Sequence, residues 1–283
     1  MNATRKVIPR TIWLLWYQGI SDAPFIVKEC VDSWVRKNPT WDVIILDSTN
    51  LNAYVDLDMP AEILENIPLT QQSDIVRLKL LSNYGGIWAD ATTLCLMPLD
   101  NWIDKYTCSG FFTFHKPGAD RLLSSWFIAS EKNCALCDKL YKELRLYWIN
   151  NKFGMLSTRK KKLVKKLSKY LNKNEKTARW WFNPLITKVL KVYPYFAIHY
   201  MFERLISKDK NCKQIWEEMK ILSADIPHLV LQRGIFSKDI SGYENEVVNL
   251  EIPMLKLTWK YDDSKYSTDS LLHHVITKNS NSS

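Results

Sequence analysis

Glycine is scarce in this sequence, and the motifs that depend on it are missing. The 283 residues include eight glycines, which are dispersed along the chain. No P-loop or G-x-G-x-x-G fingerprint is present, and no Ser-His-Asp order is recognisable. These absences exclude the nucleotide-binding classes in which a glycine-rich loop cradles the phosphates.

Long hydrophobic runs are also absent. No stretch approaches the roughly 18 apolar residues that a transmembrane helix needs. The apolar run at 12–17 is too short for a secretory signal and leads directly into globular sequence, so we expect a cytoplasmic protein. An apolar content of 46% and a charged content of 24% are ordinary for a globular protein. The length suits one large α/β domain or two small ones.

Cysteines are few and scattered. Of the six, only Cys134 and Cys137 form a close pair. A zinc site would need a second pair or a histidine cluster beside them, and neither is present. We therefore expect two packed, reduced thiols on a helix.

Acidic residues are almost missing from one basic segment. Between Arg159 and Arg179 lie ten Lys or Arg residues and a single acid, Glu175, so this segment carries the whole net charge of +9. Three interpretations are open: a solvated helical face, a nucleic-acid patch, or a helix on a membrane surface.

Apolar residues within the basic segment favour the membrane interpretation. The pattern predicts a helix over 158–173 with one apolar stripe, and aromatic residues follow at 180–182. A basic amphipathic helix with aromatic neighbours is typical of binding to anionic lipid. Since no nucleic-acid motif accompanies the charge, we expect an anionic membrane surface as partner through 159–182, and no nucleic acid. The stripe consists of Leu163, Val164, Leu167, Tyr170 and Leu171.

The stretch Ser73–Thr92 has the pattern of a ligand site. Asp74 and Arg77 are three residues apart and are expected on one face of a helix, in its first turn. Gly85-Gly86 predicts the end of that helix, and a short buried strand that ends at Asp90 follows. An acid at the carboxyl end of a central strand suits a polar ligand. A structural ion pair is the alternative.

The order of predicted elements indicates an α/β fold. Residues 8–16 are apolar on both faces, as expected of a central parallel strand. An amphipathic helix at 23–37 and a strand at 41–47 follow, so strands and helices alternate and favour a mostly parallel sheet. Further strands are predicted at 110–114 and 125–129, and further helices at 50–55, 60–67, 134–150, 158–173 and 211–222.

Several of these segments resemble the capsular polysaccharide synthesis group, relatives of GT-A α-glycosyltransferases with a DxD-type sugar-binding region. The resemblance is carried by SDIVRLKLLSNYGGIWADAT, IPRTIWLLWYQG, FFTFH and SSWFIAS. It implies a GT-A (Rossmann-like) fold with a mostly parallel central sheet and a helical insertion on the acceptor side. We expect a single domain over 1–261, with a nucleotide-sugar half to about residue 110 and an acceptor half from 111. The polar residues 262–283 are expected to form a disordered tail.

The resemblance also implies roles for individual residues. Asp74 and Arg77 are expected to contact hydroxyl groups of the donor sugar, and Asp90 to bind the nucleotide and the sugar. The loop after the first strand, with Trp16 and Tyr17, is expected beside the base or ribose.

In the resembled fold a divalent cation, Mn²⁺ or Mg²⁺, usually bridges the diphosphate, and here Asp90 and Thr92 would hold it. Thr92 stands where the second acid of D-x-D is usual, and threonine is a poor ligand for a hard cation. Lysines could neutralise the phosphates instead. Lys256 and Lys260 lie in a segment that resembles the family's closing motif, and a solvated surface strand is the alternative.

Two histidines are weaker candidates. His199 could contact the acceptor or act as a base, although the pattern slightly favours a packed helix histidine. His115 is a similar candidate at the end of a predicted strand. Trp88 and Trp126 are expected in the core, with the sugar pocket as the alternative.

The resemblance thus implies a glycosyltransferase, more specifically a hexosyltransferase. It would move a sugar from a UDP-linked nucleotide sugar to a growing bacterial surface polysaccharide or lipid-linked glycan, with retention and an α linkage. The protein would lie peripherally on the inner face of the cytoplasmic membrane. A non-catalytic, membrane-associated nucleotide- or glycan-binding protein with a degenerate site is the alternative.

Overall fold

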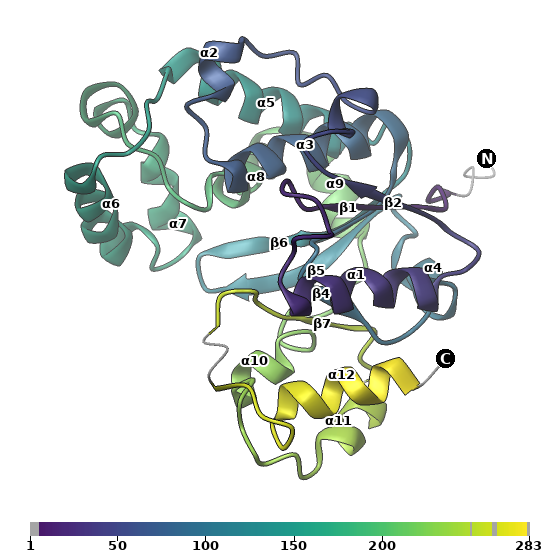
Figure 1. Cartoon of the computed structure of the whole chain (residues 1–283). Helices are drawn as coiled ribbons and strands as arrows, with labels where there is room; N and C mark the ends of the chain where they lie inside the picture. The colour runs from purple at the N-terminus through teal and green to yellow at the C-terminus, as the bar shows by residue number, and fades with distance from the viewer. Residues whose placement is uncertain (1–5, 250, 262–264, 282–283) are drawn as a thin grey trace.

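A five-stranded sheet with the strand order β2-β1-β3-β6-β5 lies at the centre of the computed structural model (Figure 1). The structure describes residues 6–249, 251–261 and 265–281. Strands β1, β2 and β3 are parallel, and β6 is antiparallel to both of its neighbours, so four of the five strands point the same way. The predicted α/β class with a mostly parallel central sheet is confirmed. The strands are β1 (Thr11–Leu15), β2 (Asp42–Leu46), β3 (Gly86–Ala89), β5 (Phe111–Gly118) and β6 (Arg121–Ser130).

Helices cover both faces of this sheet. Helices α3, α5 and α8 pack together on one face, and α1 lies on the other (Figure 1). Cys134 and Cys137 are buried at the start of α5, as expected of packed residues. The helices of this part are α1 (Phe25–Lys37), α2 (Ala61–Leu64), α3 (Leu69–Tyr84), α4 (Ile103–Tyr106), α5 (Ala135–Asn151), α8 (Ala197–Lys208) and α9 (Lys210–Glu218), with short 3₁₀ helices η1 (Leu51–Ala53) and η2 (Leu99–Asn101).

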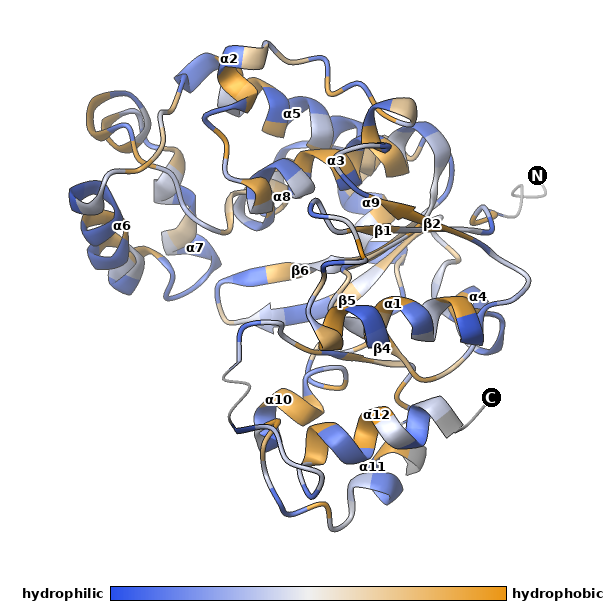
Figure 2. Cartoon of the chain, in the orientation of Figure 1, coloured by the Kyte–Doolittle hydropathy of each residue, from blue (hydrophilic) through white to orange (hydrophobic). Residues whose placement is uncertain are grey.

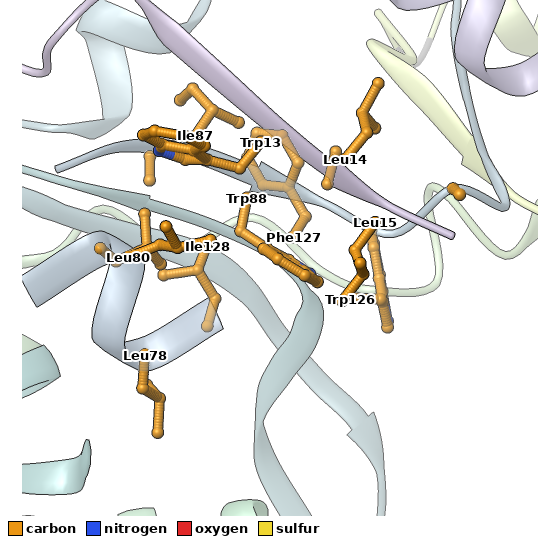
Figure 3. Close-up of a cluster of buried hydrophobic side chains, with 14 of the residues drawn as sticks. Trp13, Leu14, Leu15, Leu78, Leu80, Ile87, Trp88, Trp126, Phe127 and Ile128 are labelled. Carbon is orange, nitrogen blue, oxygen red and sulfur yellow. The ribbon is translucent and has the colours of Figure 1, made fainter. Parts of the chain in front are cut away.

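The core is formed where the central strands meet α3. Figure 3 shows Trp13 of β1, Trp88 of β3 and Phe127 of β6 gathered with leucines of α3. Trp13, Trp88 and Phe127 are at most 3% exposed. Burial of a large apolar side chain contributes roughly 1.5–3 kcal/mol, so these central strands are firmly held. The apolar run of the first strand therefore serves both faces of the sheet, as predicted.

Two glycines join α3 to β3. Gly85 and Gly86 have φ values of 69° and 93°, a region that residues with a Cβ atom rarely adopt. A Cβ atom on Gly86 would lie 2.5 Å from the carbonyl oxygen of Thr11. Glycine here permits the close approach of β3 to β1, and the predicted end of the helix is confirmed.

Helix α3 begins earlier than expected. It starts at Leu69, so Asp74 and Arg77 lie in its second and third turns instead of its first. The carbonyl oxygen of Pro68 accepts hydrogen bonds from the amides of Gln71 and the residue after it, which starts the helix at this point. Proline costs no hydrogen bond at a helix N-terminus, because the amides there have no partner within the helix.

A second, two-stranded sheet brings the C-terminal part of the chain to the centre. Strand β4 (Thr93–Cys95) pairs antiparallel with β7 (Met254–Lys256), and Thr93 lies opposite Lys256. Lys256 is therefore held beside the segment that follows Asp90. Below this sheet in Figure 1 lie helices α10 (Leu229–Arg233), α11 (Tyr243–Asn249) and α12 (Leu271–Asn281).

The prediction of a disordered tail is wrong for residues 265–281, and 262–264 and 282–283 lie outside the described residues. Helix α12 forms in this region and packs near α1. Leu271, Leu272, Val275 and Ile276 are buried. Their spacing is that of a helical stripe, which the Ser- and Asn-rich composition of the surrounding residues concealed.

The basic segment lies in a small helical lobe beside the sheet (Figure 1), which is the predicted helical insertion. The lobe has its own hydrophobic cluster, with Trp181 fully buried in it. Its elements are α6 (Thr158–Leu171), α7 (Glu175–Ala178), the 3₁₀ helix η3 (Arg179–Phe182) and the π-helical segment η4 (Leu185–Leu190).

The apolar stripe of α6 does not face outward as predicted. Leu163, Val164, Leu167 and Leu171 pack against the hydrophobic cluster of the lobe, and of the five stripe residues only Tyr170 is exposed. Figure 2 shows the hydrophilic face of α6 turned away from the lobe. The stripe is used to hold the lobe together, because the cluster would otherwise lie open to solvent. In the described part of the chain, none of the helices combines the length and apolar character needed to cross a bilayer.

Candidate active site

Two adjoining cavities lie at the carboxyl ends of β1 and β3. The chain runs from β1 to β2 on one side and then returns to β3 on the other, so the strand order reverses between β1 and β3. Ligands of open α/β sheets bind at such a point. The larger cavity has a volume of about 640 Å³ and the smaller about 310 Å³.

The structure brings nine of the predicted site residues to these two cavities, whereas the weaker candidate His115 lies elsewhere. Asp90 and Lys256 line both of them, although 166 positions separate the two in the sequence. The smaller cavity is also lined by Asp74, Arg77 and His199, and the larger by Trp16, Tyr17, Thr92 and Lys260.

Arg77 connects the helix to the strand end. One guanidinium nitrogen lies 3.3 Å from the carboxylate of Asp74 and 3.5 Å from that of Asp90. Nη1 donates a hydrogen bond to the carbonyl oxygen of Ser125 on β6, Nε donates to the carbonyl oxygen of Ser73, and Nη2, the nitrogen beside the two acids, also donates to the Ser73 hydroxyl. With its side chain only 5% exposed, Arg77 is fixed in position by partners from three elements.

Trp88 fixes the third member of this charged group. Its indole Nε1 donates a hydrogen bond of 3.0 Å to Asp90 Oδ1. The guanidinium of Arg77 also lies over the Trp88 ring, 5.0 Å from its centroid. Trp88 is thus a core residue that orients the two charges of the site without lining the smaller cavity.

The pKa of Asp74 is raised to about 7, mainly because the carboxyl group is buried. The positive charge of Arg77 opposes this shift, and the negative charge of Asp90 adds to it. Asp74 therefore titrates near neutral pH. The carboxyl groups of Asp74 and Asp90 share one arginine, and protonation of Asp74 relieves the repulsion between these two groups.

Aromatic side chains line the larger cavity. The rings of Trp16 and Trp259 meet edge to face with centroids 5.8 Å apart, and the Nζ atom of Lys260 lies 5.3 Å from the Trp259 ring centroid. The hydroxyl of Tyr17 is buried and has no hydrogen-bond partner among the described residues. Flat aromatic faces next to an unsatisfied hydroxyl suit a ring ligand that carries polar groups.

A hydrogen bond joins the side chains of Lys256 and Thr92. The ammonium Nζ of Lys256 lies 2.5 Å from Thr92 Oγ1 and 3.0 Å from the carbonyl oxygen of Leu257. The pKa of Lys256 is lowered by burial, whereas the charge of Asp90 opposes that shift.

The donor set does not fit the divalent cation that Asp90 and Thr92 were expected to hold. The Thr92 hydroxyl already accepts from an ammonium group, and Asp90 Oδ1 accepts from Trp88 and lies beside Arg77. Within residues 6–249, 251–261 and 265–281, no three His, Cys, Asp or Glu side chains are grouped for a metal ion. Hard divalent cations prefer several charged oxygens.

Two buried nitrogens without partners in the described structure belong to residues that line the smaller cavity. His199 Nδ1 and Trp126 Nε1 are buried and find no hydrogen-bond partner in the part of the chain that the structure describes. Burial, aided by the charges of Arg121 and Arg77, lowers the pKa of His199 well below its ordinary value, so its ring is neutral at neutral pH. Buried polar atoms without partners cost free energy, and a bound polar ligand would satisfy them.

Arg121 and His228 also line the smaller cavity and were missed by sequence reasoning. Arg121 lies 3.2 Å from Asp120 on the hairpin between β5 and β6, and His228 packs against Trp126 with ring centroids 5.6 Å apart. Neither lies in a periodic pattern or motif that could have indicated a site. His115 packs against Trp216 and does not line the two cavities.

Comparison with known proteins finds relatives that match a little under half of the chain. "O-glycosyltransferase braB" of Annulohypoxylon truncatum is 29% identical over 144 residues, which are 44% of this chain and 34% of that protein. "Glycosyltransferase afumC" of Aspergillus fumigatus is 28% identical over 160 residues, 49% of this chain and 40% of the relative. The matched regions thus span about a third to two-fifths of the length of these relatives.

A solved structure, "PaToxG Glycosyltransferase", aligns with a TM-score of 0.40 and 15% identity over 96% of this chain and 87% of its own. The family model described as "Capsular polysaccharide synthesis protein" matches residues 1–157, which include β1, α3 and β3 with the site residues Asp74, Arg77 and Asp90. Because this match covers more than half of its 283 residues, the chain belongs to the family of capsular polysaccharide synthesis proteins.

Proposed function

We propose that the protein is a glycosyltransferase, a hexosyltransferase that uses a nucleotide-sugar donor. The observation that carries this proposal is the pair of adjoining cavities that share Asp90 and Lys256 at the switch point of the sheet. Their volumes lie in or near the range of small-molecule sites, roughly 300–1,000 Å³. The names of the curated relatives, which are glycosyltransferases, support it.

In this proposal the larger cavity holds the nucleoside diphosphate, with UDP as the expected nucleotide. The aromatic faces of Trp16 and Trp259 stack with the base, and the hydroxyl of Tyr17 bonds to the base or ribose. The diphosphate then reaches Lys260 in the larger cavity and Lys256, which lines both cavities.

The smaller cavity holds the donor sugar. Asp74 and Arg77 form hydrogen bonds with its hydroxyl groups, because both side chains are already fixed and face the cavity. The unsatisfied nitrogens of His199 and Trp126 take further hydroxyls of the sugar or of the acceptor.

The reaction breaks the bond between the anomeric carbon and the diphosphate oxygen, which keeps the electron pair. The anomeric carbon bonds to the acceptor oxygen, whose proton passes to the departing diphosphate. Cationic groups near the leaving oxygen stabilise the charge that develops there. Retention with an α linkage is the outcome expected of the resembled enzymes.

The acceptor in this proposal is a growing surface polysaccharide or lipid-linked glycan. Tyr195 and Phe196, which follow the helical lobe, line the smaller cavity, and Phe196 also packs against the hydrophobic cluster of the lobe. Exposed lysines of α6 attract anionic lipid, and Trp180, which is 60% exposed, supplies an interfacial aromatic residue. This would place the protein peripherally on the inner face of the cytoplasmic membrane. The curated relatives are fungal, so a bacterial surface glycan stays a prediction.

The test is release of UDP from a panel of UDP-sugars by the full chain, with and without glycan acceptors. We expect turnover with at least one donor, and Asp90→Asn should abolish it. Asp32→Asn, at an exposed position on α1, is the matched control and should leave turnover unchanged. Absence of nucleotide binding and turnover across uridine, guanosine, cytidine, adenosine and thymidine donors would overturn the proposal.

A further inference from the structure

The position of the usual second acid is occupied by a hydroxyl that accepts from an ammonium group. Lys256 Nζ lies 2.5 Å from Thr92 Oγ1. A backbone hydrogen bond also joins these two segments, because the amide of Leu257 donates to the carbonyl oxygen of Thr92 at 2.8 Å. The β4–β7 pairing places Lys256 opposite Thr93. The ammonium is thus held by the register of a sheet and does not depend on a flexible loop.

The surrounding charges favour a monovalent ammonium over a divalent ion. Arg77 already pairs with both Asp74 and Asp90, the two carboxylates of the smaller cavity. An ion bound to Asp90 would meet the positive charges of Arg77 and Lys256 in a partly buried site, where repulsion is weakly screened.

Among the described residues, the ammonium group has acceptors for only two of its N–H donors. It carries three N–H donors, of which Thr92 Oγ1 and the carbonyl oxygen of Leu257 take two. Because Lys256 lines both cavities, the third donor is available where the nucleotide and sugar cavities meet.

We propose that Lys256 takes the place of the divalent cation, so that this chain binds the diphosphate of its donor without a metal ion. The inference rests on the proposed function, because it assigns the diphosphate to the boundary between the two cavities. Thr92 is then a positioning residue for the ammonium and not a metal ligand.

The first test uses the unaltered full chain. UDP affinity is measured by isothermal titration calorimetry in EDTA and again with Mn²⁺ or Mg²⁺ in excess. We expect the two affinities to agree within about twofold, whereas a bridging metal ion predicts a loss of tenfold or more in EDTA, about 1.4 kcal/mol. Because no variant is needed, misfolding does not affect this comparison.

The second test compares UDP with uridine, which lacks the diphosphate. Lys256→Met should weaken UDP binding about tenfold or more and leave uridine binding unchanged, because only the phosphate contact is lost. Thr92→Val should weaken UDP binding by a smaller factor, equally in EDTA and in Mn²⁺. Lys213→Met, at an exposed position on α9, is the control and should change neither affinity. A variant that loses uridine binding as well is misfolded. In that case the comparison of UDP affinity with and without metal ions in the unaltered chain decides whether a metal ion is needed.

The outcomes separate the two claims. UDP binding that requires Mn²⁺, or that survives Lys256→Met unchanged, overturns the role of Lys256 and leaves the glycosyltransferase proposal standing. No binding of any nucleoside diphosphate in either condition overturns the proposed function, and this inference with it.

Discussion

The guanidinium of Arg77 lies 3.5 Å from the carboxylate of Asp90, and this ion pair joins the middle of α3 to the carboxyl end of β3. The same nitrogen reaches Asp74 on its own helix. A single buried cation thus holds two acids from two elements in one orientation. Their geometry exists before any ligand binds, which reduces the ordering cost of recognition.

Arg77 should therefore be required for stability as well as for binding. Arg77→Met leaves buried Asp74 without a cation, and breaking a buried pair in this way costs roughly 3–5 kcal/mol. The free energy of unfolding in urea measures the loss. Adding Asp74→Asn to Arg77→Met should recover part of it at alkaline pH, where Asp74 would otherwise be ionised without a cation. Arg36→Met, at an exposed position on α1, should stay within about 0.5 kcal/mol of the unaltered protein.

The titration of Asp74 predicts a pH dependence of stability. Its pKa is about 7 in the folded protein, against an ordinary value of 3.8. Between these values the folded state holds a proton that the unfolded chain has lost, so the contribution of Asp74 is complete below about pH 4 and is lost as the pH rises through 7. Asp74→Asn does not titrate. Urea unfolding from pH 5 to 8 should show the unaltered protein losing stability relative to Asp74→Asn, and a gain would mean that Arg77 keeps Asp74 ionised.

Trp259 should contribute to binding through the base alone. Loss of a stacked aromatic ring costs roughly 1–3 kcal/mol per base. Trp259→Ala should therefore weaken UDP binding in calorimetry about fivefold or more, while pyrophosphate affinity stays unchanged. Trp180→Ala removes an exposed tryptophan from the lobe and should alter neither. Equal losses for UDP and pyrophosphate would contradict stacking and indicate a general disturbance of the cavity.

Membrane attachment should depend on charge more than on apolar insertion, because the stripe of α6 faces its own lobe. Replacement of four exposed α6 lysines by glutamine should release the protein from anionic vesicles in a flotation assay, at roughly 1 kcal/mol per lysine. High salt should have the same effect. The four positions are Lys161, Lys162, Lys165 and Lys166.

The control for this assay carries the same number of Lys→Gln changes at exposed positions outside the lobe. This control should float like the unaltered protein. If both variants lost vesicle binding equally, the net charge of the protein and not the position of the α6 lysines would explain the attachment. Equal flotation with neutral vesicles would contradict the electrostatic interpretation. The control positions are Lys105, Lys132, Lys213 and Lys220.

Much of the fold could be predicted because local patterns agree with the tertiary structure. The double glycine at Gly85-Gly86 is required by positive φ angles and by contact with β1, so it marks an element boundary reliably. Strands β1 and β3 are buried on both faces, and their short apolar runs beside proline or glycine are typical of central strands. Asp74, Arg77 and Asp90 were identifiable because they lie within 17 residues of sequence that fold as one helix–strand unit.

The remaining features depend on contacts between distant segments. Arg121 and His228 reach the smaller cavity through a hairpin and a C-terminal loop, and neither segment has a local pattern that indicates a site. The Lys256–Thr92 bond depends on the register of β4 with β7, which short strands leave undetermined in sequence. The α6 stripe shows the same difficulty, since amphipathicity identifies an apolar face but not whether protein or lipid covers it.

The pairing of β4 with β7 also sets an order of events during synthesis. A nascent chain that has left the ribosome up to β6 already contains Arg77 and both of its acidic partners, but not Lys256. Such an intermediate would contain the two acids and the two arginines of the smaller cavity but not the ammonium group proposed to bind the diphosphate. Affinity for the donor would arise only when the last strand is translated and docks, so unfinished chains would not sequester it.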